Sequence, residues 1–585
     1  MHSLFLKGML IAVALSVPGL ARADADSDLT QLVDSYWATR LKESPVLASS
    51  LGIDTYAGEL ADYSLAGRDR RAATAASFLE QLQSIPADQL SPDARLEFGI
   101  LQRKLRETIE ANRMGQRSIN FTNRSGWHLA IAALAGQVPF RNKADFESYN
   151  RRLQQYARVN DESIAVANVA IEGGYTLPCD AIEGYEESIN GLIAEDVENS
   201  RFYAPYTRKR PDMISESDFD ALSEQAAATI DSVIHPALRK HAHWYLETYK
   251  PACRVEPGVA AQQGGDQYYA FRIWQQTTTS LSADEIHATG LSEVARIRAE
   301  MIEVAKAAGY ESREAFVEHL RTDPRYYAKT PEELMEKVAR ETKLIDGKMP
   351  GLFGKLPRLP YGIKEIPREA AERTTTAYYL RGAPDIGIAG FYFVNTSKLD
   401  QRPFWEIPAL SLHEAVPGHH HQIALQQELS VSDFRKHGAR FNVFSEGWAL
   451  YAERLGIDME IYDTPAKDMG RLSYEMWRAC RLVVDTGIHA KGWSKARAVA
   501  FMTDNTALSH ANIEAEVNRY MSWPGQALAY KLGELKIREL RAYAAAELGG
   551  NFSLAAFHDV VLDRGPLPLD LLDARVRQWV ARQKS

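Results

Sequence analysis

The chain has 585 residues, of which 45% are hydrophobic and 25% are charged, and this composition is typical of a globular protein with a large core. Its formal net charge of -9 implies an acidic surface, so nucleic acid is not expected as a partner. The three cysteines are too few and too scattered for a zinc site built on thiolates.

The N-terminus has the features of a secretory leader. An apolar run over residues 9–20 follows Lys7 and precedes Ala21-Arg22-Ala23. We therefore expect residues 1–23 to be a signal peptide that is cut after Ala23. The run is shorter than the roughly 20 apolar residues that span a bilayer. The expectation is a secreted or periplasmic protein with no membrane span after cleavage.

Helical periodicity dominates the chain after the leader. Long amphipathic helices are predicted over residues 94–114, 146–172 and 219–249. Ser282 and Glu285 form a capping-box pattern that begins another helix, and Thr330 begins one more. We expect a mainly α fold with a helical N-terminal lobe over residues 24–270 and a catalytic, metal-binding part over residues 271–585.

Two cysteines of the N-terminal part, Cys179 and Cys253, lie beside prolines in predicted loops. In an exported protein such cysteines are able to pair, so a disulfide between them is a candidate. Cys480 lies in a helical pattern and is expected to be buried and free. The alternative is that all three are reduced packing residues.

The best candidates for extended structure are residues 373–380 and 388–396, which are rich in Thr, Tyr, Phe and Val. We expect a β-hairpin or small sheet there, directly upstream of a histidine cluster. Tyr392 and Asn395 are candidates for binding substrate in a cleft, with interior packing as the alternative. Residues 349–366 are rich in Pro and Gly and are interpreted as a loop or lobe junction.

The histidine cluster begins at His413 and reads His-Glu-Ala-Val-Pro-Gly-His-His-His. A catalytic zinc ion needs three nitrogen or oxygen ligands, and a helix can supply two of them beside a glutamate that takes a proton from water. His413 and Glu414 are the first half of such a motif. The usual second histidine, four residues on, is replaced by Pro417.

Pro417 and Gly418 interrupt the helical hydrogen bonds, so extra residues can be absorbed as a bulge. On that geometry His419 is the preferred second ligand. His420, which lies seven residues after His413 and on roughly the same helix face, remains the alternative ligand.

The third ligand should come from a separate helix. Residues 444–453 supply one with two carboxylates on the same face. Glu446 is the predicted ligand, and Glu453 is expected to orient a histidine through its second ring N–H.

Further along, Arg481, Asp485 and His489 share one helical pattern. A hydrolase needs a donor for the oxyanion, and His489 or Tyr520 can supply it, with Tyr520 preferred. Asp485 is assigned a supporting role. Arg519 is a candidate for binding a C-terminal carboxylate of the substrate. The alternatives are a buried ion pair between Arg481 and Asp485, and an interior Tyr520.

Together these motifs resemble the bacterial family known as domain of unknown function 885, which is similar to gluzincin-type zinc metallopeptidases. The resemblance rests on residues 413–420, 444–453, 481–489, 519–520 and 524–530. It implies a large, helical, two-lobed fold with a central cleft, like that of helical zinc carboxypeptidases and oligopeptidases.

We therefore hypothesise an exported hydrolase of peptides or small amides, in which His413, His419 and Glu446 hold Zn²⁺ and Glu414 is the general base. One rival is a metallo-amidase or esterase that acts on a small molecule. Another is a non-catalytic periplasmic protein that binds a metal or ligand. The sequence has no P-loop, dinucleotide-binding fingerprint or serine nucleophile elbow.

Overall fold

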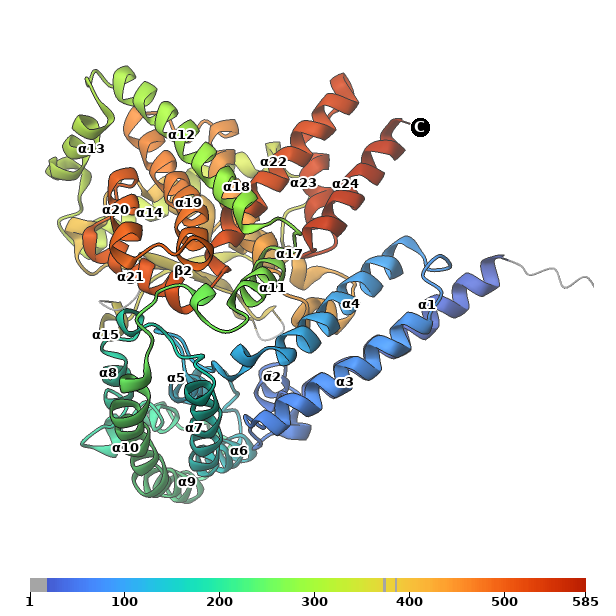
Figure 1. The fold of residues 1–585 in the computed structure, drawn as a ribbon, viewed down its shortest axis with the longest axis vertical. Helices are drawn as coiled ribbons and strands as arrows, with labels where there is room; N and C mark the ends of the chain where they lie inside the picture. Colours follow the sequence, from blue (N-terminus) through green and yellow to red (C-terminus); the bar gives the residue numbers. More distant parts are fainter. Residues whose placement is uncertain (1–17, 372–374, 385–386, 585) are drawn as a thin grey trace, which may run out of the picture.

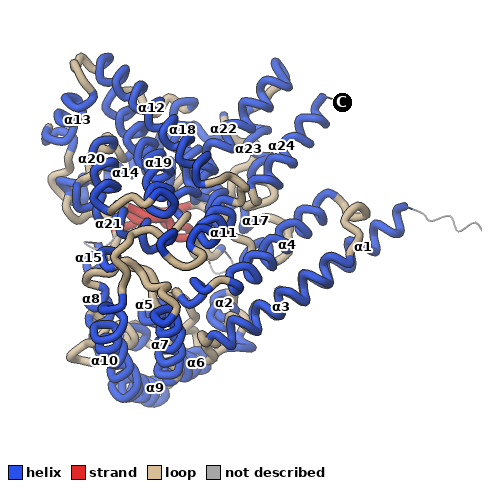
Figure 2. Tube along the Cα trace, in the orientation of Figure 1, coloured by secondary structure: helices blue, strands red, loops and turns tan. Residues whose placement is uncertain are grey.

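The computed structural model describes residues 18–371, 375–384 and 387–584, which fold mainly into α-helices around a small β-sheet (Figures 1 and 2). Residues 1–17, and with them most of the predicted leader, lie outside the described residues. The predicted cleavage site falls near the start of the first helix. None of the described helices combines the length and the apolar character that crossing a bilayer requires.

Helices follow one another along the chain. The first are α1 (Pro18–Lys42), α2 (Pro45–Ser50), α3 (Leu65–Ser84), α4 (Pro92–Arg113), α5 (Trp127–Ala132), α6 (Lys143–Gln154), α7 (Tyr156–Glu172), α8 (Tyr185–Asn190), α9 (Glu216–Thr229), α10 (His235–Trp244) and α11 (Gly265–Thr277). They continue with α12 (Ala283–Ala307), α13 (Arg313–Thr322), α14 (Pro331–Lys348), α15 (Arg368–Ala371), α16 (Ile407–Glu414), α17 (His419–Glu428) and α18 (Asn442–Asp458). The last are α19 (Pro465–Lys491), α20 (Lys495–Asn505), α21 (His510–Ser522), α22 (Ala529–Leu548), α23 (Leu554–Leu562) and α24 (Leu569–Lys584).

The predicted helices are confirmed, with breaks that periodicity alone did not mark. The segment 146–172 contains α6 and α7, which are separated at Gln155. The segment 219–249 contains α9 and α10, each followed by a π-helical turn. Both hydrogen bonds of the capping box form between Ser282 and Glu285 at the start of α12. Thr330 caps α14 by accepting a hydrogen bond from the backbone N–H of Glu333.

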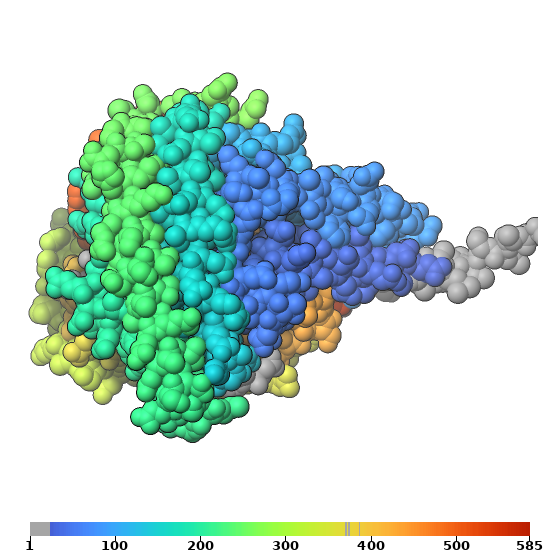
Figure 3. Space-filling view, turned by 90° about the horizontal axis from the view of Figure 1, so that it is seen from below, coloured from blue at the N-terminus to red at the C-terminus, as the bar shows by residue number. Residues whose placement is uncertain are grey.

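Helices α5 to α10 gather at the bottom of Figure 1, and most helices after α11 gather at the top. Helices α1, α3 and α4 extend to the right, and Figure 3 shows this blue segment beside the cyan and green helices when the molecule is seen from below. One hydrophobic core joins α7 and α10 to α19, and another joins α1 and α4 to α18 and α22. The predicted boundary at residue 270 therefore does not divide the hydrophobic core.

The sheet lies between these groups of helices (Figure 2) and has the strand order β1-β3-β2. Strands β2 (Ala377–Leu380) and β3 (Gly390–Val394) are antiparallel, as expected for the hairpin, although residues 373 and 374 of the predicted first strand lie outside the described residues. Strand β1 (Tyr361–Glu365) pairs parallel to β3, within the segment that was predicted to be a loop. That prediction was wrong because β1 is stabilised by a partner about 30 residues away, which local Pro and Gly content does not reveal.

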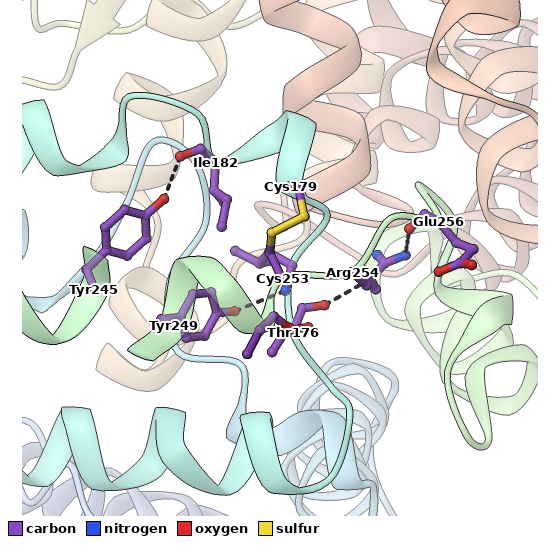
Figure 4. The surroundings of a disulfide bond; sticks show 10 residues. Thr176, Cys179, Ile182, Tyr245, Tyr249, Cys253, Arg254 and Glu256 are labelled. Carbon is purple, nitrogen blue, oxygen red and sulfur yellow. Dashed lines mark hydrogen bonds between the residues drawn. A yellow bond between two sulfur atoms is a disulfide. The ribbon is translucent and has the colours of Figure 1, made fainter. Parts of the chain in front are cut away.

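Cys179 and Cys253 form a disulfide with a Cα–Cα distance of 5.1 Å (Figure 4). The neighbouring chain segments are also joined by hydrogen bonds: the Tyr249 hydroxyl accepts one from the Leu177 N–H at 3.0 Å, and Arg254 donates one to the Thr176 carbonyl at 2.9 Å. The bridge links residues 74 positions apart and connects the segment after α7 to the segment after α10. Cys480 is buried and free.

Candidate metal centre

The histidine segment forms two helices rather than one helix with a bulge. Helix α16 ends at Glu414, the Val416–Pro417 peptide is cis, and α17 begins at His419. Gly418 lies so close to the end of α16 that a Cβ there would collide with the carbonyl oxygens of Leu412 and His413. The indole N–H of Trp448 donates to the Pro417 carbonyl at 2.7 Å and fixes the turn. The turn between α16 and α17 places the ring of His419 beside that of His413, with the ring centroids 4.8 Å apart.

His413, His419 and Glu446 converge from three helices, α16, α17 and α18. The Nε2 atoms of His413 and His419 lie 3.7 and 3.5 Å from Oε2 of Glu446. One possible ligand atom from each residue lies within 4.8 Å of the other two. Ligands about 2.1 Å from a tetrahedral zinc ion lie roughly 3.4 Å from one another, so the donor set matches in type and the two histidine-to-glutamate distances match in spacing.

Glu453 holds the orientation of His413. Its Oε1 atom accepts a hydrogen bond from Nδ1 of His413 at 2.8 Å, which leaves Nε2 of His413 turned toward Glu446. Nη2 of Arg478 lies 3.3 Å from the same oxygen. Glu453 is 1% exposed, so this contact is shielded from water. The structure thus gives Glu453 the position that was expected of a residue supporting a ligand.

The charges of the cluster favour a bound cation. Burial lowers the pKa of His413, but its interactions with Glu446 and Glu453 outweigh that effect and raise the pKa to about 9. Burial raises the pKa of Glu446, and the two histidines lower it by more, to well below its ordinary value. The carboxylates of Glu446 and Glu453 therefore stabilise the protonated, positively charged ring of His413. A divalent cation can take the place of the proton on that ring.

The alternative ligand His420 points elsewhere. Its Nδ1 atom is 3.0 Å from the Tyr379 hydroxyl, and its Nε2 atom is 3.0 Å from the Leu359 carbonyl. Both ring nitrogens thus have partners, and burial lowers the pKa of His420 to about 4. By contrast, Nδ1 of His419 is buried without a hydrogen-bond partner and its Nε2 faces Glu446. Between the two sequence alternatives the geometry favours His419.

The cluster opens onto a cavity of about 930 Å³. Glu414 lines this cavity together with His413, His419 and Glu446, so a carboxylate outside the ligand set is available beside the candidate metal position. Residues Ala377, Tyr378 and Tyr379 of β2 line it as well, and β2 is an edge strand of the sheet. The cavity is in the size range of small-molecule and peptide sites.

Three residues with predicted roles at the site are not among those that line this cavity. The Tyr520 hydroxyl donates to Glu516 at 2.8 Å and accepts from Arg481 at 3.0 Å, so it is committed to a buried network. His489 accepts from the Val259 N–H through Nδ1 and donates to the Tyr520 carbonyl through Nε2.

Asp485, the third, accepts hydrogen bonds from the Tyr269 hydroxyl at 2.6 Å and the Gly525 N–H at 3.1 Å. It joins α11 to the turn before α22 rather than supporting the metal centre. The structure thus places Tyr520, His489 and Asp485 in buried hydrogen-bond networks outside the cavity lining, because a helical pattern does not distinguish a face buried in the core from one that lines a cavity.

Of the predicted substrate-binding residues, Arg519 lines the cavity. Tyr392 is fully buried in the core beside the sheet, and Asn395 is fully buried where it donates to the Ala371 and Thr375 carbonyls. Neither Tyr392 nor Asn395 lines the cavity, because both side chains are buried within or beside the sheet.

The structure adds residues that sequence reasoning missed. Arg124, Arg402, Glu406 and Glu516 all line the cavity. Glu516 lies three residues before Arg519 and four before Tyr520, a helical spacing that would have suggested the contact. Arg124 is almost 400 residues from Glu516, with which it pairs, and the sequence has no signal for this contact.

Fold and site together define a large helical protein with a candidate metal centre in a cavity. The chain belongs to the family described as "Bacterial protein of unknown function (DUF885)", whose model matches residues 45–576. No functionally curated protein matches the sequence.

Two solved structures share the fold. A candidate lipoprotein of Colwellia psychrerythraea is 28% identical, with a TM-score of 0.87 over 96% of this chain and 99% of that one. A candidate lipoprotein of unknown function from Shewanella oneidensis is 17% identical, with a TM-score of 0.71 over 93% of this chain and 99% of that one.

Proposed function

We propose that this protein is an exported zinc-dependent peptidase with the two-lobed architecture and central cleft of helical metallopeptidases. The observation that carries the proposal is the convergence of His413, His419 and Glu446, with Glu453 behind His413 and Glu414 beside it, on one cavity. Export is supported by the leader-like N-terminus and by the description of the two similar structures as candidate lipoproteins.

In this proposal His413, His419 and Glu446 hold the zinc ion and Glu453 fixes the ring of His413. Zinc bound there supplies a Lewis acid that polarises the substrate carbonyl and lowers the pKa of water. Glu414 accepts a proton from the attacking water on a carboxylate oxygen as the water oxygen bonds to the carbonyl carbon. It then gives that proton to the amide nitrogen as the C–N bond breaks, so the products are a carboxylic acid and an amine.

A peptide fits this cavity better than a compact amide. Strand β2 is an edge strand, and its residues Ala377 to Tyr379 line the cavity, so an extended backbone can add to the sheet through main-chain hydrogen bonds.

The test is to incubate the purified protein with a mixed peptide library and identify the products by mass spectrometry. We expect cleavage that a chelator abolishes and zinc restores. Glu414→Gln should be inactive while it keeps its zinc. Glu428→Gln is the matched control, because Glu428 lies in α17, pairs with Arg358 and does not line the cavity. Intact peptides beside a cleaved small amide or ester would favour the rival amidase or esterase, and full activity of Glu414→Gln would refute the mechanism.

A further inference from the structure

The cavity carries positive charge in a protein that is acidic as a whole. Among the described residues that line it, seven lysine and arginine side chains face five carboxylates, and one of those carboxylates is the candidate ligand Glu446. The whole chain, by contrast, has a net charge of -9. A cavity whose charge is opposite to that of the surrounding surface attracts anions, and a bound metal ion would add to that field.

Much of this charge gathers around Glu516 of α21. Nη2 of Arg481 and Nη2 of Arg519 lie 3.0 and 2.9 Å from its Oε2 atom, and Nη1 of Arg124 lies 3.6 Å from its Oε1 atom. Burial raises the pKa of Glu516, but the three guanidinium groups lower it to about 2, so the carboxylate stays ionised. Three cations therefore share one anion, and two positive charges remain at this wall of the cavity.

One nitrogen of the Arg481 guanidinium has no hydrogen-bond acceptor in the structure. Its Nε donates to the Tyr520 hydroxyl and its Nη2 to Glu516, but Nη1 is buried with no hydrogen-bond partner. The planar group lies over the rings of Trp477 and Tyr530, at 4.3 and 4.5 Å from their centroids. Its side chain is 5% exposed, and the residue lines the cavity. A buried charged donor without an acceptor is costly, and an anionic ligand would remove that cost.

Arg481 and the candidate metal centre share one cavity. Arg478 contacts Glu453, which holds His413, and Arg481 follows Arg478 by three residues on α19. One such step is a rise of about 4.5 Å along the helix. Because His413, Arg478 and Arg481 all line the cavity, a peptide bound there can reach both the candidate metal centre and Arg481.

We propose that Arg481, with Arg519 and Arg124 around Glu516, binds the C-terminal carboxylate of a peptide, so that the enzyme cleaves near the C-terminus. This inference rests on the proposed peptidase function. Arg481 supplies the direct contact, and Glu516 positions the guanidinium groups. The planar group of Arg481 is suited to a carboxylate, because its N–H donors match the spacing of the two oxygens.

Binding is tested apart from turnover with zinc-loaded Glu414→Gln and isothermal titration calorimetry. The probes are an N-acetylated tetra-alanine peptide with a free C-terminal carboxylate, the same peptide as its C-terminal amide, and an amide that carries Asp as its last residue. We expect the free acid to bind about 10- to 100-fold more tightly than either amide, the range for a charge-assisted hydrogen bond.

Arg481→Gln in the same background should bind the acid and the plain amide equally, without a change in affinity for the amide. Arg402→Gln is the matched control, because Arg402 also lines the cavity with a buried, unpartnered Nε but has no contact with Glu516. It should keep the full preference. Arg124→Gln, with a side chain that is 42% exposed, is a second variant that spares the core and should reduce the preference in part.

Equal binding of acid and amide by the parent protein would overturn the inference. So would an Asp-amide peptide that binds like the free acid, or a preference lost in Arg402→Gln and retained in Arg481→Gln. With the wild-type enzyme, mass spectrometry should show peptides cut near the C-terminus, and cleavage far from the C-terminus would contradict the inference. A protein that prefers the acid but cleaves no peptide would refute the proposed function and leave the carboxylate subsite standing.

Discussion

The contact between Glu453 and His413 gives the sharpest quantitative prediction. Glu453→Gln keeps the shape of the side chain and removes the charge that accepts the Nδ1–H bond at 2.8 Å. A hydrogen bond to a charged group contributes about 1.5–3 kcal/mol, and loss of such an outer contact typically weakens metal binding about 10- to 100-fold. We expect the zinc dissociation constant to rise by that factor.

The assay is competition for zinc with a chromophoric chelator at a fixed pH. Glu414→Gln is the control, because Glu414 lies next to His413 in the sequence and lines the same cavity but is outside the proposed ligand set. Its zinc affinity should stay within a few-fold of wild type. Thermal unfolding of the metal-free proteins checks that Glu453→Gln, which also alters the contact with Arg478, is still folded. A folded Glu453→Gln variant with wild-type zinc affinity would refute the argument.

Three further predictions concern the ligands, the disulfide and a buried acid. Replacing His419 with Gln should abolish stoichiometric zinc binding, and replacing His420 with Gln should not, because both ring nitrogens of His420 have other partners; metal analysis that gives the opposite order would move the ligand to His420. Replacing Cys179 and Cys253 together with Ser should lower the free energy of unfolding by about 4 kcal/mol, the loop-closure value for a separation of 74 residues. A reductant should lower the melting temperature of wild type but not of this double variant, and equal sensitivity would contradict the bridge. Burial raises the pKa of Asp485 to about 7, so the folded chain binds that proton more tightly than the unfolded chain does, and the resulting stability is present at low pH and lost as pH rises toward 7. The melting temperature of Asp485→Asn relative to wild type should therefore rise between pH 4 and pH 8, and a constant difference would contradict the assignment.

Local rules predicted much of the helical structure. Ser282 and Thr330 cap their helices as expected, because a cap depends on residues within one turn. Strand β1 was missed because its stability comes from pairing with β3, and the Pro and Gly residues around it favour a loop when they are considered alone.

The candidate metal centre was predicted only in part for a similar reason. His413, Glu414 and Glu446 followed from motif chemistry, but the choice between His419 and His420 depended on how the chain turns at Gly418. If one helix continued across that turn, His420 would share a face with His413. In the structure α16 and α17 are separate helices, and His420 contacts Tyr379 instead.

The residues that line the cavity show more clearly what helical periodicity in the sequence cannot predict. Tyr520 and His489 were predicted as oxyanion donors because a hydrolase needs one, but their polar atoms form hydrogen bonds inside the core. No sequence pattern indicated the role of Arg124, because its contact with Glu516 joins residues almost 400 positions apart. Tertiary contacts of this kind decide which polar residues line the cavity.

The most direct test of the central claim is a crystal structure of the zinc-loaded protein with anomalous data measured on both sides of the zinc absorption edge. The account predicts one strong anomalous peak at the site, about 2.1 Å from Nε2 of His413, Nε2 of His419 and an oxygen of Glu446. The peak should be present in Glu414→Gln and absent in His419→Gln. A peak bound by His420, or no peak at these residues in crystals that contain zinc, would contradict it.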